Sequence, residues 1–111
     1  MTVPTETSTR LAARAAAIAQ RLKEQYGAQQ VILFGSVARG TASRHSDIDL
    51  LIVAPTDESY HHRMLTVLRF VDDLSRDLAL SPIVLTPDEL RARLSIGDQF
   101  IGDVVRTGHE L

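Results

Sequence analysis

Two stretches decide the fold of this chain: Val31-Ile32-Leu33-Phe34-Gly35-Ser36 and, ten residues later, Asp47-Ile48-Asp49-Leu50-Leu51-Ile52-Val53. Each contains a run of large apolar residues, several of them β-branched, which favours a buried strand. Side chains alternate between the two faces of a strand, so Asp47 and Asp49 point the same way. Neighbouring carboxylates repel each other and are costly to bury. The pair therefore predicts a cation site, and the Gly-Ser turn beside it predicts a phosphate site.

The spacing of apolar residues outside these stretches predicts the other elements. A helix is expected to begin at a cap formed by Ser8 or Thr9 and to end at Gly27, and Pro55 ends the second strand. The run Thr86-Pro87-Asp88-Glu89 is a capping box with proline in the first turn, so it starts a helix. The predicted elements are helices over 8–26, 58–78 and 87–95, a last amphipathic segment stopped by Gly108, and strands at 30–34, 47–53 and 83–85.

The resulting order is α-β-β-α-β-α-α, which is typical of an α/β (α+β) fold. We expect a small mixed β-sheet with helices packed on it. Residues 35–46 form a polar connection between the first two strands, and its length is too great for a tight hairpin. Long ordered connections at the mouth of a sheet often carry function.

Composition favours one small soluble domain. The chain has 111 residues, 44% hydrophobic and 23% charged, with a formal net charge of −2. That charge gives no strong attraction to nucleic acid or to an anionic membrane. Cysteine is absent, and no apolar run approaches the ~20 residues of a membrane span. We expect a cytoplasmic protein with a disordered tail over 1–8, which lacks signal-peptide features, and one domain over 9–111.

A wider pattern surrounds the two motifs. The stretches Phe34-Gly35-Ser36-Val37-Ala38-Arg39-Gly40 and Ser46-Asp47-Ile48-Asp49-Leu50-Leu51-Ile52-Val53 resemble the signature of the nucleotidyltransferase superfamily with the DNA polymerase β type of catalytic core. They look like the minimal nucleotidyltransferases, the MntA-like antitoxin partners of HEPN-domain toxins. Residues 84–90 resemble the third strand and following helix of that family, and residues 100–108 resemble its final helix.

The resemblance implies a nucleotidyltransferase that uses Mg²⁺, as two ions, and ATP as substrate. Such an enzyme moves an NMP unit from an NTP to an acceptor hydroxyl and releases pyrophosphate. In this reading Asp47 and Asp49 are the catalytic residues and the metal ligands, because Mg²⁺ takes carboxylates together with substrate phosphates.

The nucleotide-binding residues implied by the resemblance are Gly35, Ser36, Arg39 and Arg44. Glycine lets the backbone approach the triphosphate, and the Ser36 hydroxyl and nearby amides can donate to phosphate oxygens. Arg39 and Arg44 are contacts to the triphosphate or to the acceptor, although solvent-exposed positions are an equal alternative.

The resemblance also implies a third carboxylate on the third strand, beside the first two. In this sequence that position falls on Ser81, which is a poor Mg²⁺ ligand and no useful base. Asp77 would share a face with Ser81 only if the strand began earlier, and the end of a helix is the expected place for it. Asp72 and Asp73 are expected within a helix.

Several other side chains are compatible with a purely structural role. His61 and His62 are adjacent, so they face different directions on a helix and do not predict a metal site. His45 could shield the entrance to the site or have no role. The apolar stripe formed by Phe100, Ile101, Val104 and Val105 belongs either to the core or to an interface with a partner.

Two functions follow from the resemblance. In the first, the enzyme transfers AMP to a hydroxyl, such as that of tyrosine, on a HEPN-type toxin and silences it within a hetero-oligomer. In the second, a catalytically weakened domain neutralises the toxin by binding alone. Ser81 favours the second, and the complete Gly-Ser and aspartate motifs favour the first. A third hypothesis is a structural domain that has no functional site. We expect no binding to a membrane and no direct contact with nucleic acid.

Overall fold

The structure, a computed structural model, describes residues 3–111. Its elements are α1 (Glu6–Arg21), the π-helical turn η1 (Leu22–Tyr26), β1 (Gln30–Phe34), α2 (Gly35–Arg39), β2 (Ile48–Val53), α3 (Tyr60–Phe70), α4 (Asp72–Ser75), β3 (Leu80–Leu85), α5 (Pro87–Ser95), α6 (Gln99–Thr107) and β4 (His109–Glu110). Within this part of the chain, no helix has both the length and the apolar character needed to cross a bilayer.

The four strands form one sheet in the order β3-β2-β1-β4. β1 pairs antiparallel with β2 and with β4, whereas β2 pairs parallel with β3. The sheet is therefore mixed, as the sequence predicts, and β2 with its aspartates is a central strand.

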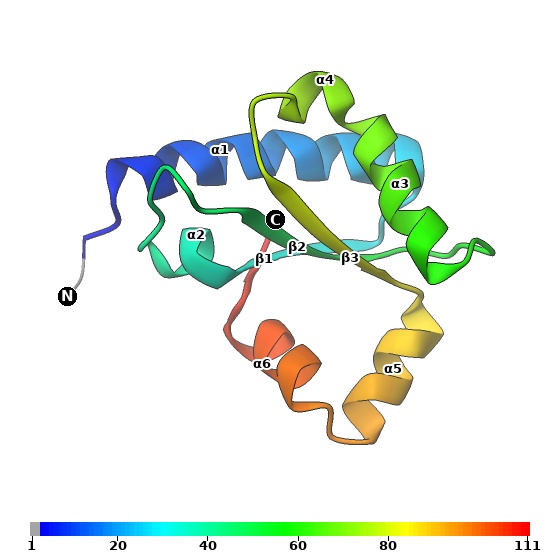
Figure 1. The fold of residues 1–111 in the computed structure, drawn as a ribbon. Helices are drawn as coiled ribbons and strands as arrows, with labels where there is room; N and C mark the ends of the chain where they lie inside the picture. The colour runs from blue at the N-terminus through cyan, green and yellow to red at the C-terminus, as the bar shows by residue number, and fades with distance from the viewer. Residues whose placement is uncertain (1–2) are drawn as a thin grey trace.

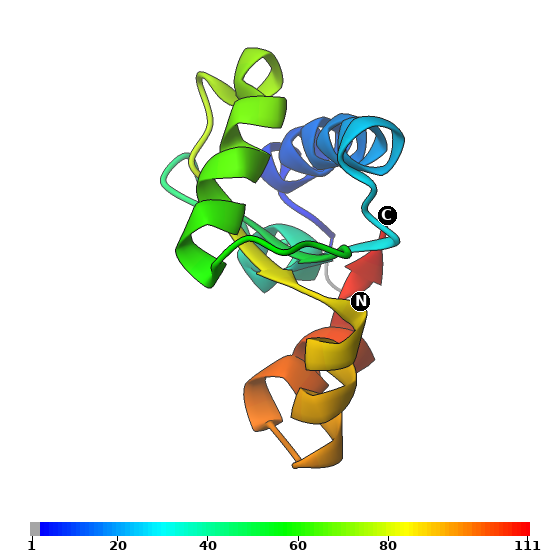
Figure 2. The same cartoon turned by 90° about the vertical axis from the view of Figure 1, so that its right-hand side faces the viewer.

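Helices cover both faces of the sheet. Figure 1 shows α1, α3 and α4 on one side and α5 with α6 on the other, and Figure 2 shows the same two layers from the end. Leu50 and Ile52 of β2 point into the larger core with α1 and α3, whereas Leu51 packs against Ile101 and Val104 of α6. By the same alternation, Asp47 and Asp49 lie on the face that carries α5 and α6.

The first helix begins earlier than predicted. Thr5 is its cap and accepts a hydrogen bond from the amide of Ser8, so Ser8 lies inside the first turn. The Ser8 side chain is buried and accepts instead from the amide of Ala42, at 2.7 Å. Residues 6–8 of the predicted tail therefore belong to α1, while Met1 and Thr2 lie outside the described residues.

The predicted helix over 58–78 is two helices, α3 and α4, separated at Val71. Val71 is buried and has φ −118° and ψ 13°, outside the helical region. Arginines of α1 donate to carbonyls on both sides of the break: Arg21 to the oxygen of Phe70 at 3.1 Å, and Arg14 to that of Leu74, near the end of α4, at 3.0 Å. These contacts stabilise a break that no Gly or Pro marks in the sequence.

The third strand, β3, begins at Leu80 and includes Pro82, where the prediction began after the proline. Proline is tolerated because β3 is an edge strand. The amide of Ile48 donates to the oxygen of Ala79, and the amide of Ala54 donates to the oxygen of Leu85. The backbone N–H and C=O groups of odd-numbered residues in β3 therefore point toward β2, and those of even-numbered residues point away from it. The nitrogen of Pro82 consequently faces outward, and no ladder bond is lost.

Two short elements add to the predicted order. α2 occupies the start of the polar connection, between Gly35 and Gly40, which both have φ +77°. β4 adds two residues to the sheet beside Ile32 and Leu33. The capping box of α5 is confirmed: Thr86 and Glu89 exchange backbone-to-side-chain bonds of 2.8 and 3.2 Å.

Candidate active site

The two aspartates lie where β2 begins. Asp49 is within the strand, opposite Phe34 of β1 and Ser81 of β3, and it is half-buried. Asp47 precedes the strand by one residue and is exposed. Asp47, Asp49 and Ser81 share one face of the sheet. Their polar groups therefore lie together at the end of this face, next to the apolar cluster that α5 and α6 cover.

Ser81 occupies the position at which the resemblance implies a third carboxylate. Its hydroxyl donates to Oδ2 of Asp47 at 3.2 Å. The parallel register also places Ser81 directly beside Asp49. A hydroxyl donor stabilises one carboxylate without adding negative charge, so the cluster holds two carboxylates rather than three.

Gly35 packs directly on Asp49. A Cβ atom added to Gly35 would overlap Oδ2 of Asp49 and lie 3.1 Å from its Cγ. Gly35 also has φ +77°, a backbone conformation that residues with a Cβ rarely adopt. Both the space and the backbone therefore require glycine, and the start of α2 comes close to the carboxylate on β2.

Burial raises the pKa of Asp49, and the nearby charge of Asp47 raises it further. The positive charge of Arg39, at the end of α2, acts in the opposite direction. The pair is thus an electrostatically unfavourable arrangement in the free protein, and a bound cation would relieve it.

A cavity of about 360 Å³ lies next to Gly35. It is lined by Phe34, Gly35, Ala38, Arg39, Thr107, Gly108 and His109. The structure thus places Arg39 near both Asp49 and the Gly-Ser turn, which Ser36 completes in the first turn of α2. His109 was missed by sequence reasoning, because only the pairing of β4 with β1 brings it here.

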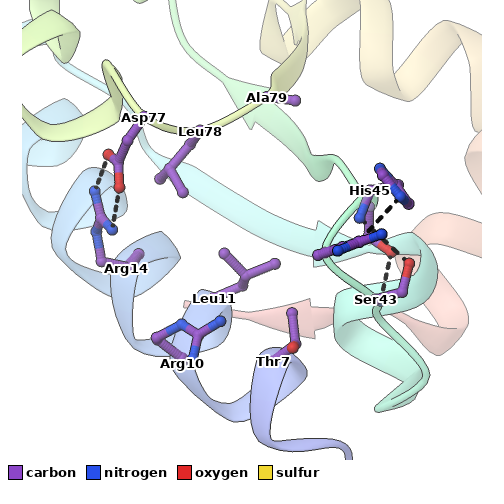
Figure 3. A pocket seen from close by; sticks show the side chains of 11 residues that line it. Thr7, Arg10, Leu11, Arg14, Ser43, His45, Asp77, Leu78 and Ala79 are labelled. Carbon is purple, nitrogen blue, oxygen red and sulfur yellow. Dashed lines mark hydrogen bonds and ion pairs between the residues drawn. The ribbon is translucent and has the colours of Figure 1, made fainter.

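Arg44 lies away from the cavity beside Gly35. It lines a separate cavity of about 400 Å³ with Arg10 and Arg14 of α1, the loop over 43–46 and residues 77–79 (Figure 3). Its Nε donates to Nε2 of His45 at 3.2 Å. The structure therefore brings Arg39, but not Arg44, to the cavity beside Gly35.

The remaining acidic candidates are engaged in ion pairs away from the site. Asp77 accepts two bonds from Arg14, at 2.7 and 3.1 Å, and Asp73 pairs with Arg21 at 2.8 Å. Asp72 pairs with Arg76 within its own helical turn. None of the three supplies the missing carboxylate, as the sequence predicts.

The C-terminal apolar stripe is only partly buried. Ile101 and Val104 are buried against the sheet, whereas Phe100 and Val105 are 53% and 40% exposed. His61 and His62 are exposed on α3, and the Nδ1 atom of His62 lies 3.0 Å from the Ser59 hydroxyl.

The aspartate pair fits a divalent cation that binds together with a nucleotide. Residues 3–111 contain no group of three or more His, Cys, Asp or Glu side chains arranged to hold a metal ion. Mg²⁺ is usually bound by one or two carboxylates with substrate phosphates and water completing its shell. Asp47 and Asp49 meet that requirement, and the repulsion between them favours it.

Comparisons with known proteins indicate the family. A family model for the nucleotidyltransferase domain matches residues 16–104. A curated relative from Methanocaldococcus jannaschii, named "Putative protein adenylyltransferase", is 35% identical over an alignment of 99 residues, and the match covers 83% of this chain. The chain spans 64% of that relative's length.

A solved structure gives the same result for the fold. The crystal structure titled as that of a "putative nucleotidyltransferase" from Sulfolobus solfataricus is 25% identical, with a TM-score of 0.60. The match covers 96% of this chain and 81% of that one. Since the family model spans most of the chain and includes the Gly-Ser and aspartate motifs, this chain belongs to the nucleotidyltransferase domain family.

Proposed function

We propose that this chain, acting in the cytoplasm as one domain that includes the whole of α1, is a Mg²⁺-dependent protein adenylyltransferase. It transfers AMP from ATP to a hydroxyl on a partner protein, a HEPN-type toxin, and neutralises it within a hetero-oligomer. The observation that carries the proposal is the contact of Gly35 with Asp49, which joins the phosphate-binding turn to the carboxylate pair. The name of the Methanocaldococcus relative supports the choice of a protein acceptor.

The chain's own residues divide the work of the reaction. Asp47 and Asp49 would hold Mg²⁺, as two ions, which supplies positive charge to the phosphates in the transition state. The amides of Gly35 and Ser36, the Ser36 hydroxyl and the Arg39 guanidinium would bind the triphosphate from the β1 side. Nucleotide specificity for ATP is part of the proposal.

The covalent step is an in-line displacement. The acceptor oxygen forms a bond to the α-phosphorus of ATP while the bond from that phosphorus to the bridging oxygen breaks, and pyrophosphate leaves. The proton of the acceptor hydroxyl passes to solvent, because Ser81 offers no carboxylate base on the β3 side.

Exposed apolar side chains on the α5–α6 layer support a protein partner. Leu94, Ile96, Phe100 and Val105 are 41%, 79%, 53% and 40% exposed. Solvent-exposed large apolar residues gathered on one layer are typical of a protein interface.

A direct test uses the purified protein with Mg²⁺, labelled ATP and a HEPN-type protein, taken from the neighbouring gene if that gene encodes one. We expect label on the partner with the parent protein, and a loss of at least ~100-fold in Asp47→Asn and Asp49→Asn. Asp57→Asn, which changes an exposed carboxylate elsewhere, is the matched control. Labelling that is unchanged in both site variants would exclude the reaction.

Ser81 keeps a second function open, in which the domain neutralises its partner by binding alone. The same variants separate the two functions. If Asp47→Asn and Asp49→Asn still neutralise the toxin as well as the parent does, binding is the main activity. If neutralisation is lost along with label transfer, catalysis is required.

A further inference from the structure

A second cavity, larger than the one beside Gly35, lies outside the site described above. Its volume is about 400 Å³, within the range of small-molecule pockets. It is formed where α1 meets the two loops that lead into β2 and β3. Ser46 and Ala79 line it, and they immediately precede Asp47 and the start of β3. The cavity therefore lies at the end of the sheet where β2 and β3 begin, on the α1 side, whereas Asp47 and Asp49 lie on the face that carries α5 and α6.

The cavity carries uncompensated positive charge. Arg14 is neutralised by Asp77, which Figure 3 shows at one end, opposite Ser43 and His45. Within residues 3–111, neither Arg10 nor Arg44 makes an ion pair with a carboxylate. A guanidinium presents a planar fork of donors that matches a carboxylate or a phosphate.

The loop that carries Arg44 is held in place before any ligand arrives. The amide of Ser43 donates to the Ser46 hydroxyl at 2.9 Å, and the amide of Ser46 donates to the oxygen of Ser43 at 3.0 Å. On the other side, the Thr5 hydroxyl donates to the oxygen of Ala42 at 2.8 Å. Preorganisation of this kind reduces the entropy lost on binding.

Reaction geometry assigns a role to this side of the sheet. An in-line displacement needs the attacking oxygen and the leaving pyrophosphate on opposite sides of the reacting phosphorus. Gly35 and the proposed triphosphate contacts lie on the β1 side of Asp49, and Ser81 lies on the β3 side. The acceptor therefore approaches from the β3 side, and a partner protein bound there would reach the cavity around the end of the sheet, past Ser46 and Ala79.

We propose that this cavity binds an oxyanion, a carboxylate or a phosphate, next to the acceptor hydroxyl of the partner protein. The inference rests on the proposed function, and it names a recognition element that the partner must carry. Two guanidiniums without a carboxylate partner in the described residues, those of Arg10 and Arg44, suit one such oxyanion. A nucleic acid backbone would require a more extended basic surface than a chain of net charge −2 offers.

Binding is tested by NMR on the intact protein with three tyrosine peptides. The tyrosine is flanked by glutamate, by phosphoserine or by glutamine. We expect the first two peptides to shift the signals of Arg10, Arg44 and the 43–46 loop, with at least ~10-fold weaker binding by the glutamine peptide. The stronger of the two anionic probes identifies the source of the oxyanion.

The double variant R10Q/R44Q should bind both anionic peptides at least ~10-fold more weakly. The matched control is R69Q, which removes an exposed arginine on α3. Single variants R10Q and R44Q cover the case in which the double variant is unstable. Equal binding by parent and variants, or shifts confined to residues 35–39, would overturn the proposal. If an oligoribonucleotide binds in the same cavity more tightly than the peptides do, the proposal that the acceptor is a protein would be overturned.

Transfer kinetics separate this proposal from the proposed function. We expect R10Q/R44Q to raise the KM for the partner about 10-fold while the KM for ATP stays unchanged. If the parent transfers no label but the anionic peptides still bind in the cavity, the adenylyltransferase activity fails and the oxyanion site stands. If the parent transfers label and the double variant does so equally well, the oxyanion site fails alone.

Discussion

Gly35 and Asp49 are in contact across β1 and β2, so that the carboxylate lies where a side chain at position 35 would begin. Gly35→Ala should lower the free energy of unfolding by about 2–4 kcal/mol, because strain at φ +77° adds to a steric overlap. It should also weaken ATP binding. Chemical denaturation and nucleotide titration check both effects.

The control for that variant is Gly97→Ala. Gly97 has nearly the same backbone, φ +76°, but no described atom lies within 4 Å of an added Cβ. We expect a cost of about 1 kcal/mol and unchanged ATP binding. Equal losses in the two variants would mean that the contact with Asp49 is unimportant.

Asp49→Asn should make the protein slightly more stable while removing metal binding. The substitution relieves the burial of a charge and its repulsion by Asp47, for a gain of about 0.5 kcal/mol after its partial exposure is considered. Thermal unfolding measures the stability, and electron paramagnetic resonance of Mn²⁺ with ATP measures the metal. A variant that is less stable than the parent would contradict the electrostatic account.

Ser81→Asp should create a third carboxylate beside Asp47 and Asp49. We expect Mn²⁺ to bind at least ~10-fold more tightly in the absence of nucleotide, since three carboxylates attract a cation more strongly than two. Ser81→Asn, similar in size to Asp but uncharged, is the control. Metal affinity that is the same in both variants would argue that residue 81 does not reach the metal.

Arg63 and Glu89 join α3 to α5 through bonds of 2.6 and 3.2 Å, and the Arg63 side chain is only 9% exposed. Arg63 holds the pKa of Glu89 below its usual value, with help from the Thr86 amide. This pair therefore stabilises the fold above the unfolded pKa of ~4.3, and the stabilisation is lost as the pH falls through the lower folded pKa.

Glu89→Gln should thus lower the free energy of unfolding at pH 7 by about 1–2 kcal/mol, since it leaves a buried guanidinium without its charged partner. The difference from the parent should shrink as the pH falls toward 3. Denaturation curves at a series of pH values measure it. A difference that does not depend on pH would assign the loss to packing or to the helix cap instead.

Local signals explain what the sequence predicted. β1 and α5 match the predicted bounds, because an apolar run ending in Gly-Ser and a complete capping box are short-range patterns. The common face of Asp47 and Asp49 follows from strand alternation alone. The place of Ser81 beside them follows once the resemblance aligns the third strand.

The remaining features depend on contacts between distant residues. The break at Val71 carries no Gly or Pro, and arginines of α1 stabilise it from outside the segment. The separation of Arg39 from Arg44 depends on the path of a loop, which no periodicity encodes. His109 reaches the site only through a strand of two exposed residues.

Pro82 has a consequence for assembly of this sheet with other chains. Its ring presents no donor at the outer edge of β3, and the outward carbonyl of Val84 already accepts from Arg63 at 3.3 Å. An incoming strand would thus find this edge blocked at two neighbouring positions, a common protection against edge-to-edge aggregation. Overproduced protein should therefore resist fibril formation through β3, and replacing Pro82 would expose that edge to strand addition.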